Sequence, residues 1–330
     1  MFKPVFGIIC LLALAGPASA QAACDGAIAA LTSSFTSGDV TAVMAAWGIV
    51  QSTPDCPAAT VTGARSQTSA VLARVAQAQL ATGDVDGAET VVLQAPGMHW
   101  AVQAVRGDIA AARGQRDEAA KLYNAALDTL GDPGLTVQSE QLVPVATRLA
   151  QLAQENMMLA GSMNTTISRG GKATGVMGMV TRGLVIEKVP VAGATADPAY
   201  VAPDYNVVTA AAAQVETVFL PINFDFDSDV LDAAGVREAL RLSEFLKANY
   251  VAEITISGHT DDAGAADYNL DLSLRRAESL AAFLASDDVE TAIFVQGFGE
   301  SEPPHLLDAG IYSFEEFRTI SRRVEVSFGY

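Results

Sequence analysis

The chain has 330 residues, which is enough for two or three domains. Half of its residues are hydrophobic but only 7% are aromatic, so alanine and aliphatic residues dominate and packed helices are favoured. The formal net charge of −18 disfavours a nucleic-acid surface or attraction to anionic lipid.

The N-terminus has the pattern of an export signal. Lys3 supplies the charged start, residues 5–16 form a short apolar core, and Ala18-Ser19-Ala20 fits a small-x-small cleavage site. The apolar core is too short for a membrane span, which argues against an uncleaved anchor. We therefore predict a signal peptide over residues 1–20 and an exported protein of the periplasm. No later segment reaches membrane-spanning length without charge.

Two cysteines, Cys24 and Cys56, remain after removal of this signal. In an exported chain they are most simply a disulfide, which would clip the first pair of helices. The competing interpretation is lipid attachment at Cys24, but Gln21 stands where an aliphatic residue is usual. The histidines are far apart in sequence, so we predict no metal site and no cofactor.

Residues 21–160 are predicted to be a helical domain. Similar turns recur between helical runs, with SerGlyAspVal at 37–40, ThrGlyAspValAspGlyAlaGlu at 82–89 and ArgGlyGlnArgAspGluAlaAla at 113–120. After the third turn, small residues flank Tyr123, a pattern that resembles tetratricopeptide repeats. An alanine-rich bundle explains the pattern about as well. Both interpretations predict stacked helical hairpins that bind a partner protein or act as a spacer, closed by a helix over 141–159.

Residues 161–213 are rich in Gly, Ala, Thr, Val and Pro. This composition predicts an extended linker, with residues 181–191 as a candidate strand. Such a linker would let a C-terminal module reach a distant target.

Residues 214–330 alternate between strand and helix patterns. Strands are expected over 215–226, 252–260, 291–297 and 322–328, with helices over 231–249 and downstream of residue 260. The first helix places Leu240, Leu242, Phe245 and Leu246 on its core side. The order βαβαβ–insert–β predicts an α+β domain with two helices on one face of a mixed sheet. Arg323 and Glu325 are expected to pair on the strand surface.

Two residues of this part stand out by helix phase. Arg276 shares a stripe with Leu272 and Leu280, where a guanidinium is costly unless it meets an anion. Arg275 falls on the polar side instead. Asp261, on the turn upstream, is the nearest candidate partner for Arg276.

Six pieces of this part form an ordered set of motifs. They are PheAspPheAspSer at 224–228, GlyHisThrAspAspAlaGly at 258–264, TyrAsn at 268–269, LeuSer with ArgArgAla at 272–277, GlyPheGlyGlu at 297–300 and ArgArgValGlu at 322–325. In order and spacing they resemble one family, the OmpA-like peptidoglycan-binding domain of outer-membrane protein A, peptidoglycan-associated lipoprotein and flagellar motor stators. The chain departs from the family at Ser321, where asparagine is usual, and over residues 303–317. Both departures lie at one rim of the expected pocket.

The resemblance implies a ligand, the diaminopimelate-containing stem peptide of Gram-negative peptidoglycan. The end of diaminopimelate carries an ammonium, which Asp261 would bind, and a carboxylate, which the planar fork of Arg276 would bind. Further ligand-binding candidates are Asn269, on ligand backbone or as a brace of the loop, Thr260 and Gly264 around the turn, and Asp225 and Arg322 at the pocket edge.

We therefore expect a non-enzymatic protein of the periplasm, associated with the outer membrane, that anchors a helical interaction domain to the cell wall. Two alternatives remain at this point. In the first alternative, the chain is a helical-repeat scaffold with an idle pocket, in which Asp261 and Arg276 serve stability alone. In the second, it is a cell-wall hydrolase using His259, which lacks a nucleophile or metal partner in the sequence.

Overall fold

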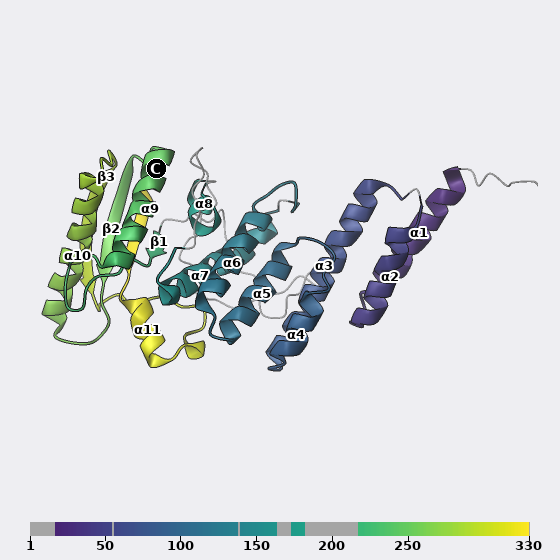
Figure 1. Ribbon diagram of the computed structural model, residues 1–330, viewed down its shortest axis with the longest axis horizontal. Helices are drawn as coiled ribbons and strands as arrows, with labels where there is room; N and C mark the ends of the chain where they lie inside the picture. Colours follow the sequence, from purple (N-terminus) through teal and green to yellow (C-terminus); the bar gives the residue numbers. More distant parts are fainter. Residues whose placement is uncertain (1–16, 55, 138, 164–172, 182–216, 330) are drawn as a thin grey trace, which may run out of the picture.

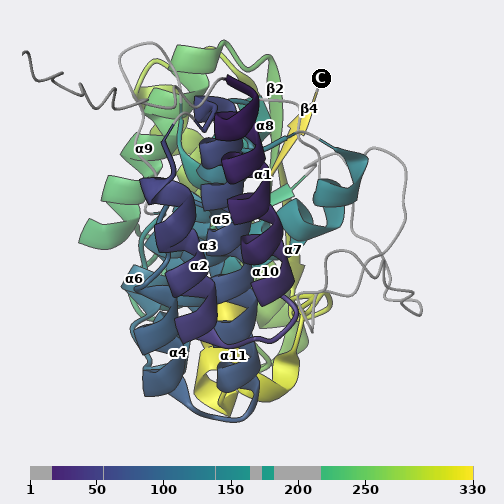
Figure 2. The same cartoon turned by 90° about the vertical axis from the view of Figure 1, so that its right-hand side faces the viewer.

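The computed structural model describes residues 17–54, 56–137, 139–163, 173–181 and 217–329. The molecule is elongated, with a row of helices at one end and a sheet with its own helices at the other (Figure 1). Viewed along the long axis from the α1 end, the helices lie in front of the C-terminal part (Figure 2). Residues 1–16 of the predicted signal peptide lie outside the described residues.

The N-terminal part consists of helical hairpins, as predicted. The turns around residues 38, 83 and 114 each separate the two helices of one hairpin. The elements are α1 (Pro17–Ser34), α2 (Val40–Ser52), α3 (Ala58–Ala81), α4 (Val85–Val92), α5 (Trp100–Ala112), α6 (Arg116–Leu130), η1 (Glu140–Leu142) and α7 (Val143–Ala160).

Small residues allow these helices to pack closely. The ring of Tyr123 in α6 lies against Gly107 in α5, where an added Cβ would come within 2.7 Å of the ring. Tyr123 is fully buried, and its hydroxyl donates to Asp108 at 2.7 Å. The glycine is therefore required by the close approach of α6 to α5.

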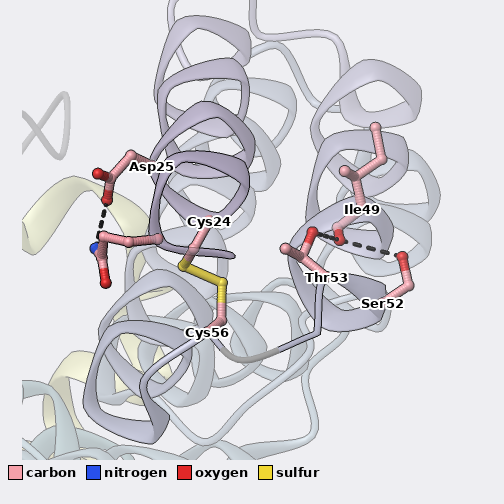
Figure 3. Close-up of a disulfide and its surroundings, with 7 residues drawn as sticks. Cys24, Asp25, Ile49, Ser52, Thr53 and Cys56 are labelled. Carbon is pink, nitrogen blue, oxygen red and sulfur yellow. Dashed lines mark hydrogen bonds between the residues drawn. A yellow bond between two sulfur atoms is a disulfide. The ribbon is translucent and has the colours of Figure 1, made fainter. Parts of the chain in front are cut away.

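A disulfide joins Cys24 in α1 to Cys56, just before α3, with the Cα atoms 5.3 Å apart (Figure 3). It ties α1 to the connection between α2 and α3. Here α1 and α2 share a small apolar cluster with the start of α3, which includes Leu31, Trp47 and Ala64. The bond also occupies the Cys24 sulfur that the lipidation alternative requires.

The C-terminal part has the predicted α+β order. Its four-stranded mixed sheet has the strand order β1-β4-β2-β3, in which β2 and β3 are parallel and β4 is antiparallel to both of its neighbours. Two helices, α9 and α10, bury their apolar stripes against Ile254, Ile256 and Val326. The elements are β1 (Thr217–Leu220), α9 (Ala233–Asn249), β2 (Glu253–His259), α10 (Ala266–Ser286), β3 (Ala292–Gly299), η2 (Ala309–Ile311), α11 (Phe314–Ser321) and β4 (Val324–Gly329).

Two expectations for this part are wrong. Leu240 is 41% exposed, whereas Leu242 is fully buried, because positions two apart are rotated by about 200° around a helix. Arg323 and Glu325 do pair, at 2.6 Å, but their side chains are only 2% and 6% exposed. The Arg323 guanidinium lies over the Phe219 ring, so this ion pair is buried under neighbouring elements.

The two parts of the molecule contact each other directly. Helix α7 covers the edge strand β1, where the Gln154 side chain accepts a hydrogen bond from the Phe219 N–H at 2.7 Å. Glu155 is fully buried and accepts from the Tyr312 hydroxyl at 2.5 Å and the Leu307 N–H at 3.2 Å. One continuous apolar cluster runs from the helices into the sheet. The helical part is therefore packed on the C-terminal part.

Part of the segment predicted as a linker is helical. Residues Gly175–Thr181 form α8, which packs on α6. The Val176 N–H donates to Asn124 and the Gly175 N–H to Asp128, both at 2.9 Å. The candidate strand over 181–191 begins at the last residue of α8, which is helical, and its residues 182–191, like residues 164–172, lie outside the described residues. None of the helices in the described ranges combines the length and apolar character needed to cross a membrane.

Candidate functional site

The site is built around the turn between β2 and α10. Asp261 follows β2, and its Oδ1 accepts a hydrogen bond from the Ala263 N–H at 3.0 Å. Gly264 has φ +109°, a backbone conformation that L side chains rarely adopt. The turn therefore depends on one carboxylate oxygen of Asp261 and on glycine at 264, as expected for a residue that shapes the turn.

Asn269 and Thr260 brace this turn from beneath. Asn269 is 2% exposed, and its Nδ2 donates to the Asp261 carbonyl at 3.3 Å and to Glu300 at 2.6 Å. The Thr260 N–H donates to the Gly299 carbonyl at 2.9 Å, and its buried hydroxyl has no hydrogen-bond partner among the described residues. Of the two roles considered for Asn269, this geometry supports the brace.

Asp261 pairs with Arg322, rather than with Arg276 as the helix phase suggested. The Arg322 Nη1 lies 2.5 Å from Asp261 Oδ2, with 42% of the Arg322 side chain and 11% of the Asp261 side chain exposed. Arg322 is the C-cap residue of α11, and it reaches the turn from 61 residues further along the chain. Arg322, which was expected at the pocket edge, therefore lies at the centre of the site.

Arg276 is half-buried and is held by groups that leave its charge uncompensated. Its Nε donates to the Ser228 carbonyl at 2.9 Å, and the guanidinium lies 5.2 Å from the centroid of the Phe224 ring. No carboxylate of the described residues forms an ion pair with it. Burial, and then the charge of Arg322, hold the pKa of Arg276 below its ordinary value. An anion bound here would offset both the burial of the Arg276 charge and its repulsion by Arg322.

Arg275, the adjacent residue, behaves as its polar helix phase predicts. It pairs with Asp271 at 2.9 Å and with Asp229 at 3.4 Å, and its side chain is 37% exposed. The two neighbouring arginines therefore differ in one respect that matters for binding. Arg275 already has carboxylate partners, whereas Arg276 has none in the part of the chain that the structure describes.

The turn after β1 supports Arg276 from the other side. Asp227 has φ +53°, and its carboxylate accepts from the Tyr268 hydroxyl at 2.5 Å. Asp225 lies in the same turn with an exposed side chain, and its N–H donates to the Val230 carbonyl. Within the described ranges, the Asp225 carboxylate bonds to no other site residue. Sequence reasoning did not find Tyr268 as a support for this turn.

Helix α11 forms the third side of the site. It begins inside the unusual segment 303–317 and ends four residues beyond it. Arg318 pairs with Asp262 at 2.9 Å, and Arg322 also bonds to Thr319 at 3.2 Å. Sequence reasoning missed Arg318. The capping-box pattern of Ser313 and Glu316 is a readable signal for this helix, since a serine followed three residues later by glutamate marks a helix start.

Together these residues bring the carboxylate of Asp261 and the guanidinium groups of Arg276 and Arg322 within electrostatic range of one another. Such an arrangement suits a zwitterion, whose ammonium meets the carboxylate and whose own carboxylate meets the cations.

His259 is buried and stacks on Phe298, with ring centroids 5.3 Å apart, so it belongs to the packing of the sheet. The described residues contain no cluster of His, Cys, Asp and Glu suited to a metal ion.

A cavity of about 180 Å³ lies elsewhere, among α4, α5 and α6 of the helical part. Arg113 and Glu89 line it and already form an ion pair at 2.8 Å. We assign it no ligand.

Comparison with known protein families identifies both parts of the chain. Residues 223–306 match the OmpA family, and residues 58–153 match a tetratricopeptide repeat-like domain. The chain therefore carries a helical, tetratricopeptide-like region followed by an OmpA-like domain, which confirms both resemblances and the predicted fold class.

Individual relatives share the C-terminal part. Outer membrane porin F of Pseudomonas fluorescens is 35% identical over 121 residues, which are 36% of this chain and 35% of that protein. Peptidoglycan-associated lipoprotein of Brucella melitensis is 35% identical over 89 residues, 27% of this chain and 53% of that protein. The chain thus spans about a third to a half of the length of these curated relatives.

Among solved structures, the OmpA-like domain of FopA1 from Francisella tularensis is similar to 34% of this chain. The match covers 71% of that chain at 25% sequence identity, with a TM-score of 0.29.

Proposed function

We propose that the protein binds peptidoglycan non-covalently through its C-terminal domain and presents its helical domain to another protein. The observation that carries the proposal is the state of Asp261 and Arg276. They lie on one turn-and-helix unit, yet they are not paired with each other. Arg276 keeps its Nη1 and Nη2 groups for an anion, while Asp261 is already held in place by Arg322 and the turn.

The terminal carbon of diaminopimelate fits this charge pattern. Its ammonium binds Asp261, and its carboxylate binds the planar fork of Arg276, with Arg322 as a second cation nearby. Asn269 and Gly264 keep the turn in shape for this contact. Of the remaining candidates, Thr260 supports the turn from below and Asp225 stays at the exposed edge.

The cellular location follows the same reasoning. The relatives are named as an outer membrane porin and a peptidoglycan-associated lipoprotein. The Cys24–Cys56 disulfide suits an oxidising compartment. We place the protein in the periplasm of a Gram-negative bacterium, in association with the outer membrane.

The test is retention of the full chain by purified sacculi. We expect Asp261→Ala and Arg276→Ala to lose retention and the matched control, Arg275→Ala, to keep it, because Arg275 has its own carboxylate partners. Equal retention of wild type and the two site variants would show this mechanism to be wrong.

The second candidate function is the helical scaffold with an idle pocket. It predicts that wild type is not retained by sacculi, while residues 21–160 still capture a protein partner. Cleavage of muropeptides that survives loss of both Asp261 and Arg276 would instead indicate a hydrolase.

A further inference from the structure

Helix α11 touches the helical domain on one side. Its residue Glu316 accepts a hydrogen bond from Arg116 of α6 at 2.5 Å. Just before the helix, the Tyr312 hydroxyl donates to the buried Glu155 of α7 at 2.5 Å, and the Arg116 guanidinium lies 5.6 Å from the Tyr312 ring. These contacts join α11 to two helices of the N-terminal part.

The same helix touches the proposed ligand site on its other side. Arg318 pairs with Asp262, the neighbour of Asp261 in the turn. Arg322, the C-cap residue of α11, bonds to Asp261 directly and to Thr319 one turn earlier. In Figure 1, α11 lies below both the sheet and α7, between the two parts of the molecule.

Helix α11 is rigid enough to fix its contacts with the helical domain relative to its contacts with the ligand site. It has only eight residues, and its first turn is locked by the reciprocal capping box of Ser313 and Glu316. Ile320 is fully buried in a cluster with Met158 of α7 and Phe219 of β1. A short, packed helix moves as a unit, so a shift at Glu316 displaces Arg322 as well.

We propose that Arg116 and Glu155 of the helical domain are positioning residues for the ligand site, which act by holding α11 so that Arg322 stays beside Asp261. This inference rests on the proposed function. It makes the helical domain part of the apparatus that grips the ligand, in addition to its role as a binding surface for a partner.

The experiment measures binding of a soluble diaminopimelate-containing muropeptide to the full chain. Arg116→Ala should weaken binding about two- to thirtyfold, the range that corresponds to coupling of about 0.5–2 kcal/mol through packed contacts. Arg113→Ala is the matched control, because Arg113 pairs with Asp86 and Glu89 inside the helical domain. It should bind as wild type does.

A second measurement separates positioning from a loss of folding. In an Arg322→Ala background, Arg116→Ala should have no further effect, since its route to the ligand is already removed. Tyr312→Phe deletes a single hydroxyl and should weaken binding in the same direction as Arg116→Ala.

The outcomes are distinguishable. If wild type binds and Arg116→Ala binds equally well, the positioning role is overturned and the proposed function stands. If the effect of Arg116→Ala persists in full without Arg322, Arg116 does not act by holding Arg322 beside Asp261, and the inference is overturned. If wild type itself does not bind the muropeptide, the proposed function fails and this inference fails with it.

Discussion

The proposed site should distinguish diaminopimelate from lysine, which has the same side chain without the terminal carboxylate. The Arg276 Nε is committed to the Ser228 carbonyl, so Nη1 and Nη2 are the groups that can hold a ligand carboxylate. Charge-assisted hydrogen bonds of this kind contribute about 1.5–3 kcal/mol. Wild type should therefore bind a diaminopimelate muropeptide about 10- to 150-fold more tightly than the matching lysine muropeptide.

Replacing Arg276 by methionine should remove this preference. Methionine fills a similar volume beside Phe224 but cannot bind an anion, so the two muropeptides should bind Arg276→Met with affinities within about threefold of each other. Arg275→Met, one position away, should keep the wild-type preference. Isothermal titration of wild type and the two variants with the two peptides, at one salt concentration, measures all six affinities. If Arg276→Met still discriminates as strongly as wild type, the carboxylate is bound elsewhere and the reasoning is refuted.

Three further predictions concern the helical domain. Burial raises the pKa of Asp108 from 3.8 to about 6, so its ionisation should cost the folded state about 2–3 kcal/mol as pH rises from about 4 to about 6. Asp108→Asn should remove most of that loss, and urea unfolding of both proteins at pH 4 and pH 7 measures it. Gly107→Ala should lower the free energy of unfolding by about 1–3 kcal/mol, because its Cβ would overlap the Tyr123 ring, and thermal unfolding tests this. Reducing the Cys24–Cys56 bond should cost about 3–4 kcal/mol for a separation of 32 residues, measurable as a lower urea midpoint with reductant.

Local patterns in the sequence predicted most of the elements, since periodicity and turn residues are set by neighbours along the chain. The close contact of Gly107 with Tyr123 follows from small residues at regular spacing. The pairing of Asp261 with Arg322 does not, because 61 residues separate them and many arginines compete for one aspartate. Helix phase showed that Arg276 needs an anion, but it had no means of showing that Asp261 already has a cation.

The contact between the domains was also beyond local patterns. Composition suggested that residues 161–213 hold the domains apart, yet buried contacts join α7 to β1 and to the segment before α11. The feature of the sequence that indicates this contact is Glu155, a carboxylate on the buried side of helix α7. Burial raises its pKa, and Tyr312 from the other domain supplies its hydrogen bond. A buried carboxylate of this kind has meaning only once its distant partner is known.

Each domain covers a surface of the other that would otherwise be exposed: α7 covers the edge strand β1, and the OmpA-like domain covers an apolar face of α7. An edge strand such as β1 presents unpaired N–H groups that invite association, and Gln154 of α7 takes one of them. A helical stack also leaves an apolar face at its last helix, which a polar cap normally covers, and here the OmpA-like domain buries Met158 of α7 with Phe219 and Tyr312. Because the covering is mutual, a load applied to the helical domain reaches the Asp261 turn through α7, β1 and α11. The proposed function, in which the C-terminal domain binds the cell wall and the helical domain binds a partner, requires such a path of packed contacts.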